Sequence, residues 1–273
     1  MTPLAVALAL TLCACATSRA SRPPSPQSDD AASASLAPVL APDYGPLHEA
    51  KVGPYRFRVP AAYFRFQSGP YFDGSWGVHV LWPNLGPVPL GRLREQTVLD
   101  QAHDVSIDFS YIDKIDIRQK LDRHTRPFSD TPETRDDPSE SFSGRIRGEA
   151  VHGLTPWRVD VEAYRRYANK YYPGNPRALE PRNRDDWYVA YSPDGQLRTL
   201  IVCDSSEIPE QYVIEGRRLR YLGGVPAPGC THTFNLLDRK IAIDMSYSRG
   251  LLRDWALFEK RAVELFDTFL VKD

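Results

Sequence analysis

Apolar and polar side chains alternate with a period of two along much of this chain. The clearest run is residues 105–111, where Val, Ile, Phe and Tyr alternate with Ser and Asp. Such alternation is typical of a β-strand with one buried and one solvent-facing side. The same pattern recurs in residues 55–59 and 76–82. We therefore expect half-buried strands to form most of the structure.

Two pairs of predicted strands are separated by short turn sequences. Residues 187–203 contain Ser-Pro-Asp-Gly at 192–195, where Pro presets φ and Gly tolerates a positive φ. Residues 230–247 contain Leu-Asp-Arg at 237–239, between two further alternating runs. Each pair is expected to form an antiparallel hairpin.

The C-terminal segment has a helical period instead. Its apolar residues fall on one stripe at 3.6-residue spacing: Leu251, Leu252, Trp255, Phe258, Ala262, Val263, Phe266, Phe269 and Leu270. Charged residues, Arg261 among them, lie outside the stripe and are expected to face solvent. The sequence thus predicts an α+β fold, an antiparallel β-sheet built from hairpins with a C-terminal amphipathic helix packed on one face.

The N-terminal residues have the features of an export signal. An apolar stretch, residues 4–12, is followed by Cys13, Ala14 and Cys15. The order of a small residue and then a cysteine resembles a bacterial lipobox, in which that cysteine is lipidated. The stretch is shorter than the roughly 20 apolar residues of a membrane-spanning helix. We expect residues 1–14 to be a lipoprotein signal peptide and Cys15 to carry the lipid.

The location of the protein follows from this assignment. Residues 1–3 contain no Lys or Arg, unlike the basic n-region of a typical signal peptide. An ordinary signal peptide with incidental cysteines is therefore the alternative. Ala16 follows the predicted lipid site, and the lack of Asp there resembles lipoproteins sorted to the outer membrane. The predicted location is the periplasm, with an N-terminal lipid anchor in the outer membrane.

Composition divides the rest of the chain in two. Residues 15–45, which begin at the lipidated cysteine, are dominated by Ala, Ser and Pro. Such a composition buries too little apolar surface to offset its ordering entropy, so this segment is predicted to be a disordered tether. Residues 46–273 fall within the range of one domain. They are predicted to form a single α+β domain.

Two cysteines lie beyond the export signal, Cys203 and Cys230. Disulfides persist in oxidising compartments such as the periplasm. Both cysteines stand at an end of a predicted strand, so we predict that they form a disulfide bond. The alternative is a pair of buried thiols that act as small apolar residues.

Catalytic motifs are missing from the sequence. It contains no Gly-x-Ser-x-Gly, no His-Glu-x-x-His and no Walker loop, and its six histidines have no ligand-like spacing. The formal net charge of −1 gives no global field that would favour nucleic acid. We therefore predict a protein that is not an enzyme, with no metal, no cofactor and no nucleic-acid partner.

One strand face carries two carboxylates. Asp104, Ser106 and Asp108 alternate with apolar residues, so they share a face and could present carboxylates to a cation. Strand alternation alone also produces this pattern. We interpret the face as an ordinary solvated one.

Residues 164–172 form a basic and aromatic cluster. Tyr and Arg are enriched at interface hot spots, so we predict partner contacts there. The predicted partner-binding residues are Tyr164, Arg165, Arg166, Tyr167 and Tyr171. Alternatively, the tyrosines pack on the sheet at helical spacing while the cations stay in water. The cluster follows a predicted strand at residues 157–163, and residues 125–143 are predicted to be an exposed loop.

Several C-terminal motifs carry a family resemblance. They are Cys230-x-His232-x-Phe234, Ile241-x-Ile243-x-Met245-x-Tyr247-x-Arg249 and Leu251-x-x-x-Trp255. With Leu81-Trp82-Pro83-Asn84 and residues 55–60, they resemble periplasmic lipoproteins of Gram-negative bacteria. Some of these are encoded beside type VI secretion effectors. The resemblance implies an immunity protein that binds a toxic enzyme arriving in the periplasm, for which a phospholipase is a candidate.

Three classes of function are consistent with these observations. The first is a tethered protein that binds and neutralises a secreted effector enzyme. The second is a structural or assembly lipoprotein of the cell envelope. The third is an enzyme acting on envelope material. The absence of catalytic motifs favours the first two classes.

Overall fold

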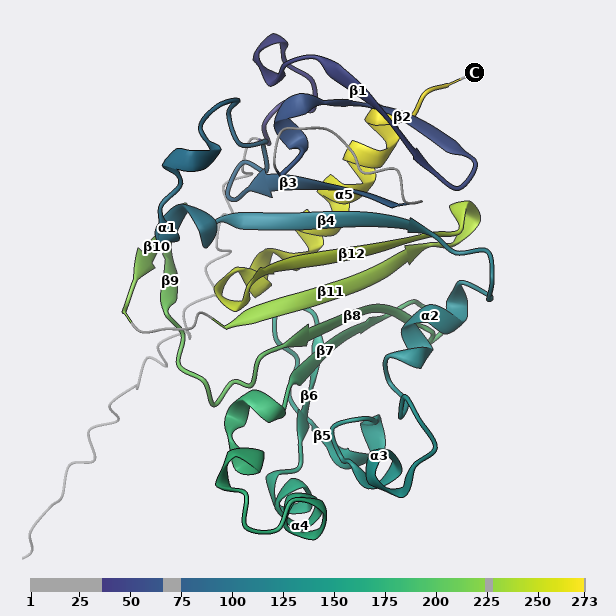
Figure 1. Cartoon of the computed structure of the whole chain (residues 1–273), viewed down its shortest axis with the longest axis vertical. Helices are drawn as coiled ribbons and strands as arrows, with labels where there is room; N and C mark the ends of the chain where they lie inside the picture. The colour runs from purple at the N-terminus through teal and green to yellow at the C-terminus, as the bar shows by residue number, and fades with distance from the viewer. Residues whose placement is uncertain (1–35, 66–74, 224–227, 273) are drawn as a thin grey trace, which may run out of the picture. The chain divides into compact units, whose positions relative to one another are not determined.

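The computed structural model describes residues 36–65, 75–223 and 228–272 (Figure 1). Its centre is an eight-stranded sheet in the order β3-β4-β12-β11-β8-β7-β6-β5, with every neighbouring pair antiparallel. These strands are β3 (Ser75–Leu81), β4 (Asp104–Tyr111), β5 (Arg145–Arg147), β6 (Thr155–Val159), β7 (Asp186–Tyr191), β8 (Leu197–Cys203), β11 (Gly229–Leu236) and β12 (Ile241–Ser248). Two further hairpins are β1 (Leu47–Val52) with β2 (Tyr55–Pro60) and β9 (Tyr212–Glu215) with β10 (Arg218–Tyr221).

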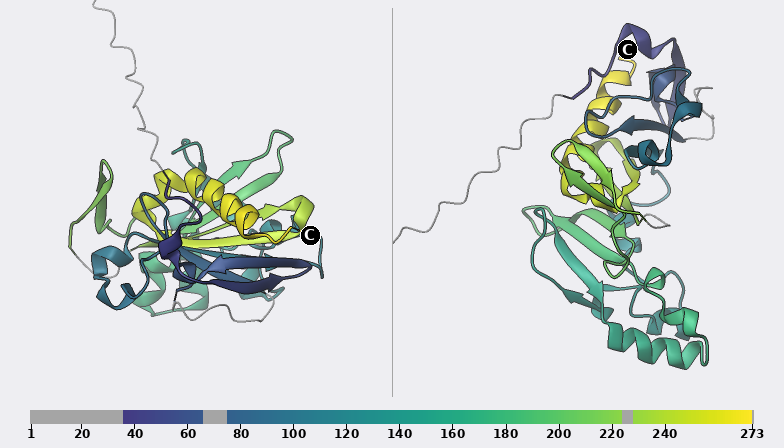
Figure 2. Two further views of the ribbon diagram at one scale, coloured as in Figure 1. Left: turned by 90° about the horizontal axis from the view of Figure 1, so that it is seen from above. Right: turned by 90° about the vertical axis from the view of Figure 1, so that its left-hand side faces the viewer.

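The α-helices are short except for the last two. They are α1 (Val98–Gln101), α2 (Arg118–Arg123), α3 (Pro132–Asp136), α4 (Val161–Tyr171) and α5 (Trp255–Phe269). Helix α5 lies behind the sheet in Figure 1 and along one side of it in Figure 2. The predicted α+β fold, an antiparallel sheet with the C-terminal helix on one face, is confirmed. Both predicted hairpins, β7–β8 and β11–β12, are present.

The main hydrophobic core lies between α5 and the sheet. The Trp76 ring of β3 stacks on Phe109 of β4, with 4.5 Å between ring centroids. Phe266 of α5 packs at 5.0 Å from Phe57, which belongs to the β1–β2 hairpin. The hairpin therefore closes the core beside β3. Ring pairs of this kind contribute beyond their buried area because edge and face charges complement each other.

A hydrogen-bonded polar chain is buried within this core. The Tyr247 hydroxyl lies 3.1 Å from His232 Nδ1, and His232 Nε2 lies 3.2 Å from Glu259 Oε1 on α5. Glu259 also accepts hydrogen bonds from the Thr199 hydroxyl at 2.6 Å and from Arg198 at 2.7 Å. Because every member has a partner, α5 can be buried here without an unpaired charge.

Helix α4 corrects the strand predicted for residues 157–163. Strand β6 ends at Val159, and the helix begins at Val161. The Asp160 carboxylate accepts hydrogen bonds from the backbone N–H groups of Glu162 and Ala163, at 2.9 and 3.1 Å. Such an N-cap satisfies amide groups that a starting helix leaves unpaired. The period-two pattern around this residue was therefore misleading.

Two other segments were predicted to be an exposed loop (residues 125–143) and the end of a disordered tether (residues 36–45). Residues 125–143 contain helix α3, whose Thr131 side chain accepts a hydrogen bond from Thr134 N–H at 3.3 Å. Before β1, Val39 is buried, and its carbonyl accepts a hydrogen bond from the Tyr63 hydroxyl at 3.0 Å. Residues 36–45 thus lie against the domain. The signal peptide and the earlier part of the predicted tether lie outside the described residues.

Arg261 was predicted to face solvent, which was wrong. Its side chain is fully buried beneath α5. The guanidinium donates to the Leu85 carbonyl at 3.0 Å and to Glu264 at 2.9 Å, with the Tyr63 hydroxyl at 3.4 Å. Leu85 comes from the loop after β3 and Tyr63 from the segment after β2, whereas Glu264 lies on α5 itself. A stripe on a helical wheel cannot reveal such neighbours.

Candidate interaction surface

The sheet face opposite α5 is polar along β3, β4, β12 and β11. Strand register places His79, Ser106, Ser246 and Thr231 in one row across these strands. The neighbouring row consists of Gly77, Asp108, Asp244 and Thr233. A Cβ at Gly77 would lie 2.1 Å from Asp108 Oδ1, so only glycine leaves room for this carboxylate. Small hydroxyl groups and carboxylates therefore make up most of this face.

Asp104, Ser106 and Asp108 share this face as the sequence indicated. Asp104 lies 2.8 Å from His79 Nδ1, and the Ser106 hydroxyl donates to Asp108 at 3.2 Å. Among the described residues, no group of three or more His, Cys, Asp or Glu side chains could hold a metal ion. The two carboxylates are instead engaged with neighbours on the sheet.

A cavity of about 690 Å³ opens on this face where β4 begins and β12 ends. We call it the acidic hollow. Apart from the phenols of Tyr212 and Tyr247, its ionisable lining groups are three carboxylates, one imidazole and one guanidinium: Asp104, Asp185, Asp204, His79 and Arg65. Hydroxyl groups of Ser106, Thr231, Ser246 and Ser248 complete its polar wall. With His79 paired to Asp104, two aspartates and the guanidinium of Arg65 remain, so the charge balance of the hollow is negative.

Asp185 and Asp204 face each other across the β7–β8 pair. Asp186 pairs with Cys203 in register, so the residue before β7 and the residue after β8 lie opposite one another. Burial, followed by repulsion from Asp204, raises the pKa of Asp185 to about 6. Asp204 accepts a hydrogen bond from Gly229 N–H at 2.7 Å. Among the described residues, none donates a hydrogen bond to the Asp185 carboxylate.

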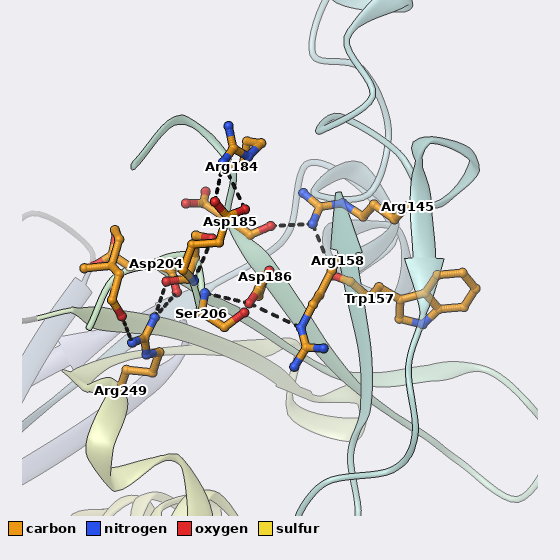
Figure 3. Close-up of polar contacts among 12 residues, drawn as sticks. Arg145, Trp157, Arg158, Arg184, Asp185, Asp186, Asp204, Ser206 and Arg249 are labelled. Atoms are coloured by element: carbon orange, nitrogen blue, oxygen red, sulfur yellow. Dashed lines mark hydrogen bonds and ion pairs between the residues drawn. The ribbon is translucent and has the colours of Figure 1, made fainter. Parts of the chain in front are cut away.

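Buried arginines hold the backbone of both aspartates (Figure 3). Arg145 of β5 donates to the Asp185 carbonyl at 2.5 Å, and Arg249 donates to the Asp204 carbonyl at 2.7 Å. Arg249 also pairs with Glu210 at 2.5 Å. Both arginines are less than a tenth exposed. The backbone at the two aspartates is therefore held by groups that have little freedom themselves.

The neighbouring Asp186 serves a structural purpose. It is buried, accepts a hydrogen bond from Ser206 N–H at 2.8 Å and lies 3.8 Å from Arg158 (Figure 3).

Ser248 lies on the wall of the hollow and carries an unpaired hydroxyl group: its Oγ atom is buried and finds no hydrogen-bond partner among the described residues. A buried hydroxyl without a partner costs free energy that a ligand can recover.

The predicted partner-binding cluster lies on α4 and is split between two environments. Tyr164 and Tyr167 are buried, and burial raises the pKa of Tyr164 to about 12. Tyr171 is partly buried and donates to Asp136 at 2.7 Å. Arg165 and Arg166 are exposed, the former beside Glu162 at 2.5 Å. The tyrosines thus hold α4 to the domain, and a partner contact through the two arginines stays a prediction.

The cysteine predictions have two outcomes. Cys203 and Cys230 form a disulfide that joins β8 to β11, as predicted. Cys13 and Cys15 lie outside the described residues. Among the residues that the structure does describe, no helix is long and apolar enough to cross a membrane.

The buried polar chain resembles a proton relay but is closed to substrates. Tyr247, His232 and Glu259 are hydrogen-bonded in sequence, yet His232 has no exposed surface. A catalytic base must reach the proton that it abstracts. This chain therefore acts within the core, and the exposed chemistry of the sheet lies on the opposite face.

The aspartates of the hollow were missed by sequence reasoning. The Ser-Pro-Asp-Gly turn alone does not place Asp185 opposite Asp204, because the β7–β8 register shifts by one residue between Ala190 and Tyr191. The sequence also did not show that Arg145 and Arg249 hold the backbone of the two aspartates, because each arginine lies far along the chain from the carbonyl that it binds.

Comparison with known proteins gives one strong structural match. No protein-family model and no curated protein matches the chain. The fold is similar to that of Smlt3025, an immunity protein of the Stenotrophomonas maltophilia type IV secretion system, with a TM-score of 0.73 and 29% sequence identity. The match covers 83% of this chain and 94% of that one. This protein therefore has an immunity-protein-like fold.

A second match is much weaker. The Neisseria meningitidis iron-regulated outer membrane lipoprotein FrpD superposes with a TM-score of 0.45 and 9% identity, over 86% of this chain and 97% of that one. No functional conclusion follows from a likeness at this level.

Proposed function

We propose that this protein is a periplasmic immunity lipoprotein that binds and neutralises a toxic effector delivered by a secretion system. The observation that carries the proposal is the 29% identity and TM-score of 0.73 to an immunity protein over 94% of its length. A tight inhibitor needs a specific surface of standard size and no reactive group. An exposed polar sheet face above a rigid core meets that requirement.

The finer details belong to the same proposal. The lipid on Cys15 tethers the domain to the outer membrane, where it meets effectors as they enter. The motif resemblance favours a type VI effector, with a phospholipase as the candidate, whereas the structural match is to a type IV system protein. The delivery apparatus is therefore a matter for experiment.

A competition experiment between sister cells tests the proposal without knowledge of the effector. A strain deleted for this gene is mixed with its parent, and survival is counted. We expect the deletion strain to be killed by the parent and rescued by the full-length gene. Parents lacking the type IV or the type VI apparatus show which system delivers the effector. Lysophospholipid or free fatty acid in dying cells would identify a phospholipase.

Two further results decide between the alternatives. An envelope defect of the deletion strain in the absence of any attacker would favour a structural lipoprotein and contradict the proposal. For the tether, the Cys15→Ser variant should lose its acyl mass and leave the membrane fraction. If that variant fractionates like the wild type with no acyl mass on either, the lipid anchor is wrong.

A further inference from the structure

The carboxylates in and beside the acidic hollow differ in whether a cationic side chain of the protein pairs with them. Asp104 is paired with His79 at 2.8 Å, and on the same sheet face Asp244 is paired with Lys120 of α2 at 2.5 Å. Among the residues that the structure describes, neither Asp185 nor Asp204 forms a salt bridge through its carboxylate, although Arg65 also lines the hollow. Asp104 and Asp244 thus each have a cationic partner within the chain. Asp185 and Asp204, in the hollow, are available to a cationic group of another molecule.

The backbone of Asp185 and Asp204 is held on both strands. Their backbone carbonyls are held by Arg145 and Arg249, both buried. They share a cavity of about 690 Å³ with Ser248, whose buried Oγ has no partner among the described residues. Acceptors around an open cavity, with one hydroxyl still unsatisfied, form a site prepared for a donor-rich group.

The chemistry of the wall identifies that group. The carboxylates of Asp185 and Asp204 and the hydroxyls of Ser246 and Ser248 are hydrogen-bond acceptors that line the same cavity. A guanidinium presents five N–H donors in a fixed planar fork, whereas an ammonium is a compact point charge. Arginine is also enriched at interface hot spots, and small side chains around the hollow allow a partner backbone to approach.

We propose that the acidic hollow receives an arginine side chain of the effector, held between Asp185 and Asp204. This inference rests on the proposed function for the identity of the partner. The arginine replaces cavity water, and its charge offsets the mutual repulsion of the two aspartates. The surrounding row of His79, Ser106, Ser246 and Thr231 forms the rest of the contact.

A small-molecule titration tests the hollow alone. Backbone amide shifts of the protein are followed while N-acetyl-arginine amide is added, with the neutral isostere N-acetyl-citrulline amide as the matched ligand control. We expect saturable shifts near Asp185, Asp204 and Ser248 with arginine only, and their loss in the Asp185→Asn/Asp204→Asn variant. Equal responses to both ligands, or none to arginine, would overturn the proposal.

The competition experiment tests the hollow in the full-length protein. Asp185→Asn/Asp204→Asn should bind the effector roughly 30-fold or more weakly, because one partner of a buried charge pair has been removed. Protection of the deletion strain should fall accordingly, with a melting temperature no lower than that of the wild type, because the substitutions remove the repulsion between the two carboxylates. The control Glu149→Gln/Asp238→Asn removes two exposed charges elsewhere and should protect fully.

Each outcome separates the two proposals. Full protection by the double Asn variant, in a strain that dies without the gene, would overturn the hollow and leave the immunity function intact. Loss of protection by Arg165→Glu/Arg166→Glu alone would place the contact on α4 instead. If the deletion strain is not killed, the proposed function fails, and the arginine titration still decides the hollow.

Discussion

The two faces of the central sheet are built from the same strands but differ in chemistry. Strand β4 presents Val105, Ile107 and Phe109 toward α5, each without exposed surface. Its other side carries Asp104, Ser106 and Asp108. The α5 face buries large rings, whereas the opposite face exposes small polar groups. The comparison indicates that stability is concentrated on one face, which leaves the other free to serve recognition.

The largest expected effect is on the α5 face. Phe266 has no exposed surface and packs against the rings of Phe57 and Phe109. Phe266→Ala should lower the free energy of unfolding by about 4 kcal/mol, through lost transfer energy and a cavity. Ser246→Ala, exposed on the opposite face, should change it by no more than about 0.5 kcal/mol. Urea denaturation measures both, and comparable losses would contradict the comparison.

The second largest change in the free energy of unfolding is expected from loss of the disulfide. Cys203 and Cys230 are separated by 27 residues, and a crosslink of that span stabilises by about 3.5 kcal/mol in the chain-entropy account. We expect the double Cys→Ala variant to lose about this amount. Reductant should destabilise the wild type similarly and leave the variant unchanged. A fully reduced wild-type protein with an unaltered urea midpoint would show the estimate to be wrong.

The smallest effect is a pH dependence from the buried polar chain. Burial lowers the pKa of His232 from 6.5 and outweighs the attraction of Glu259. The unfolded state then binds the proton more readily, so this stability is present above about pH 6.5 and lost as pH falls toward the folded pKa. The slope is at most about 1.4 kcal/mol per pH unit.

Urea midpoints at pH 7.5 and 5.5 measure this slope. The pKa of Glu259 is also lowered, because hydrogen bonds from His232, Thr199 and Arg198 outweigh desolvation. Its contribution is lost only below about pH 4.5, outside the interval. His232→Gln should therefore remove the His232 contribution to the slope between the two pH values and leave those of His124, whose pKa is also lowered by burial, and of Asp185, whose raised pKa of about 6 gives a slope of opposite sign. An unchanged slope would assign the pH dependence to other groups.

The architecture was predictable because its signals are local. The alternation in β4, the turn at Gly195 and the stripe ending at Phe269 each require only neighbouring residues. The disulfide was predictable because compartment and strand position both indicated it. Local rules failed where one residue changed the backbone, as at Asp160, whose side chain caps α4.

The site was less accessible to sequence reasoning because it depends on long-range partners. Nothing in the sequence around Arg145 or Arg249 indicates that these cations are buried. In the structure each is buried and donates to a carbonyl group far along the chain. The aromatic residues of α4 were conspicuous, but Tyr164 and Tyr167 pack inward. The conspicuous aromatic composition of α4 therefore marked a packing surface. The hollow is formed largely by small residues that strand register brings side by side.

The bond between Cys203 and Cys230 also has a covalent consequence. It makes a closed ring of the segment that includes β9 and β10. A protease that cuts once anywhere within this ring leaves the two resulting polypeptides linked. The strands β8 and β11 would stay side by side, and the nicked molecule would separate into fragments on a gel only after thiol treatment.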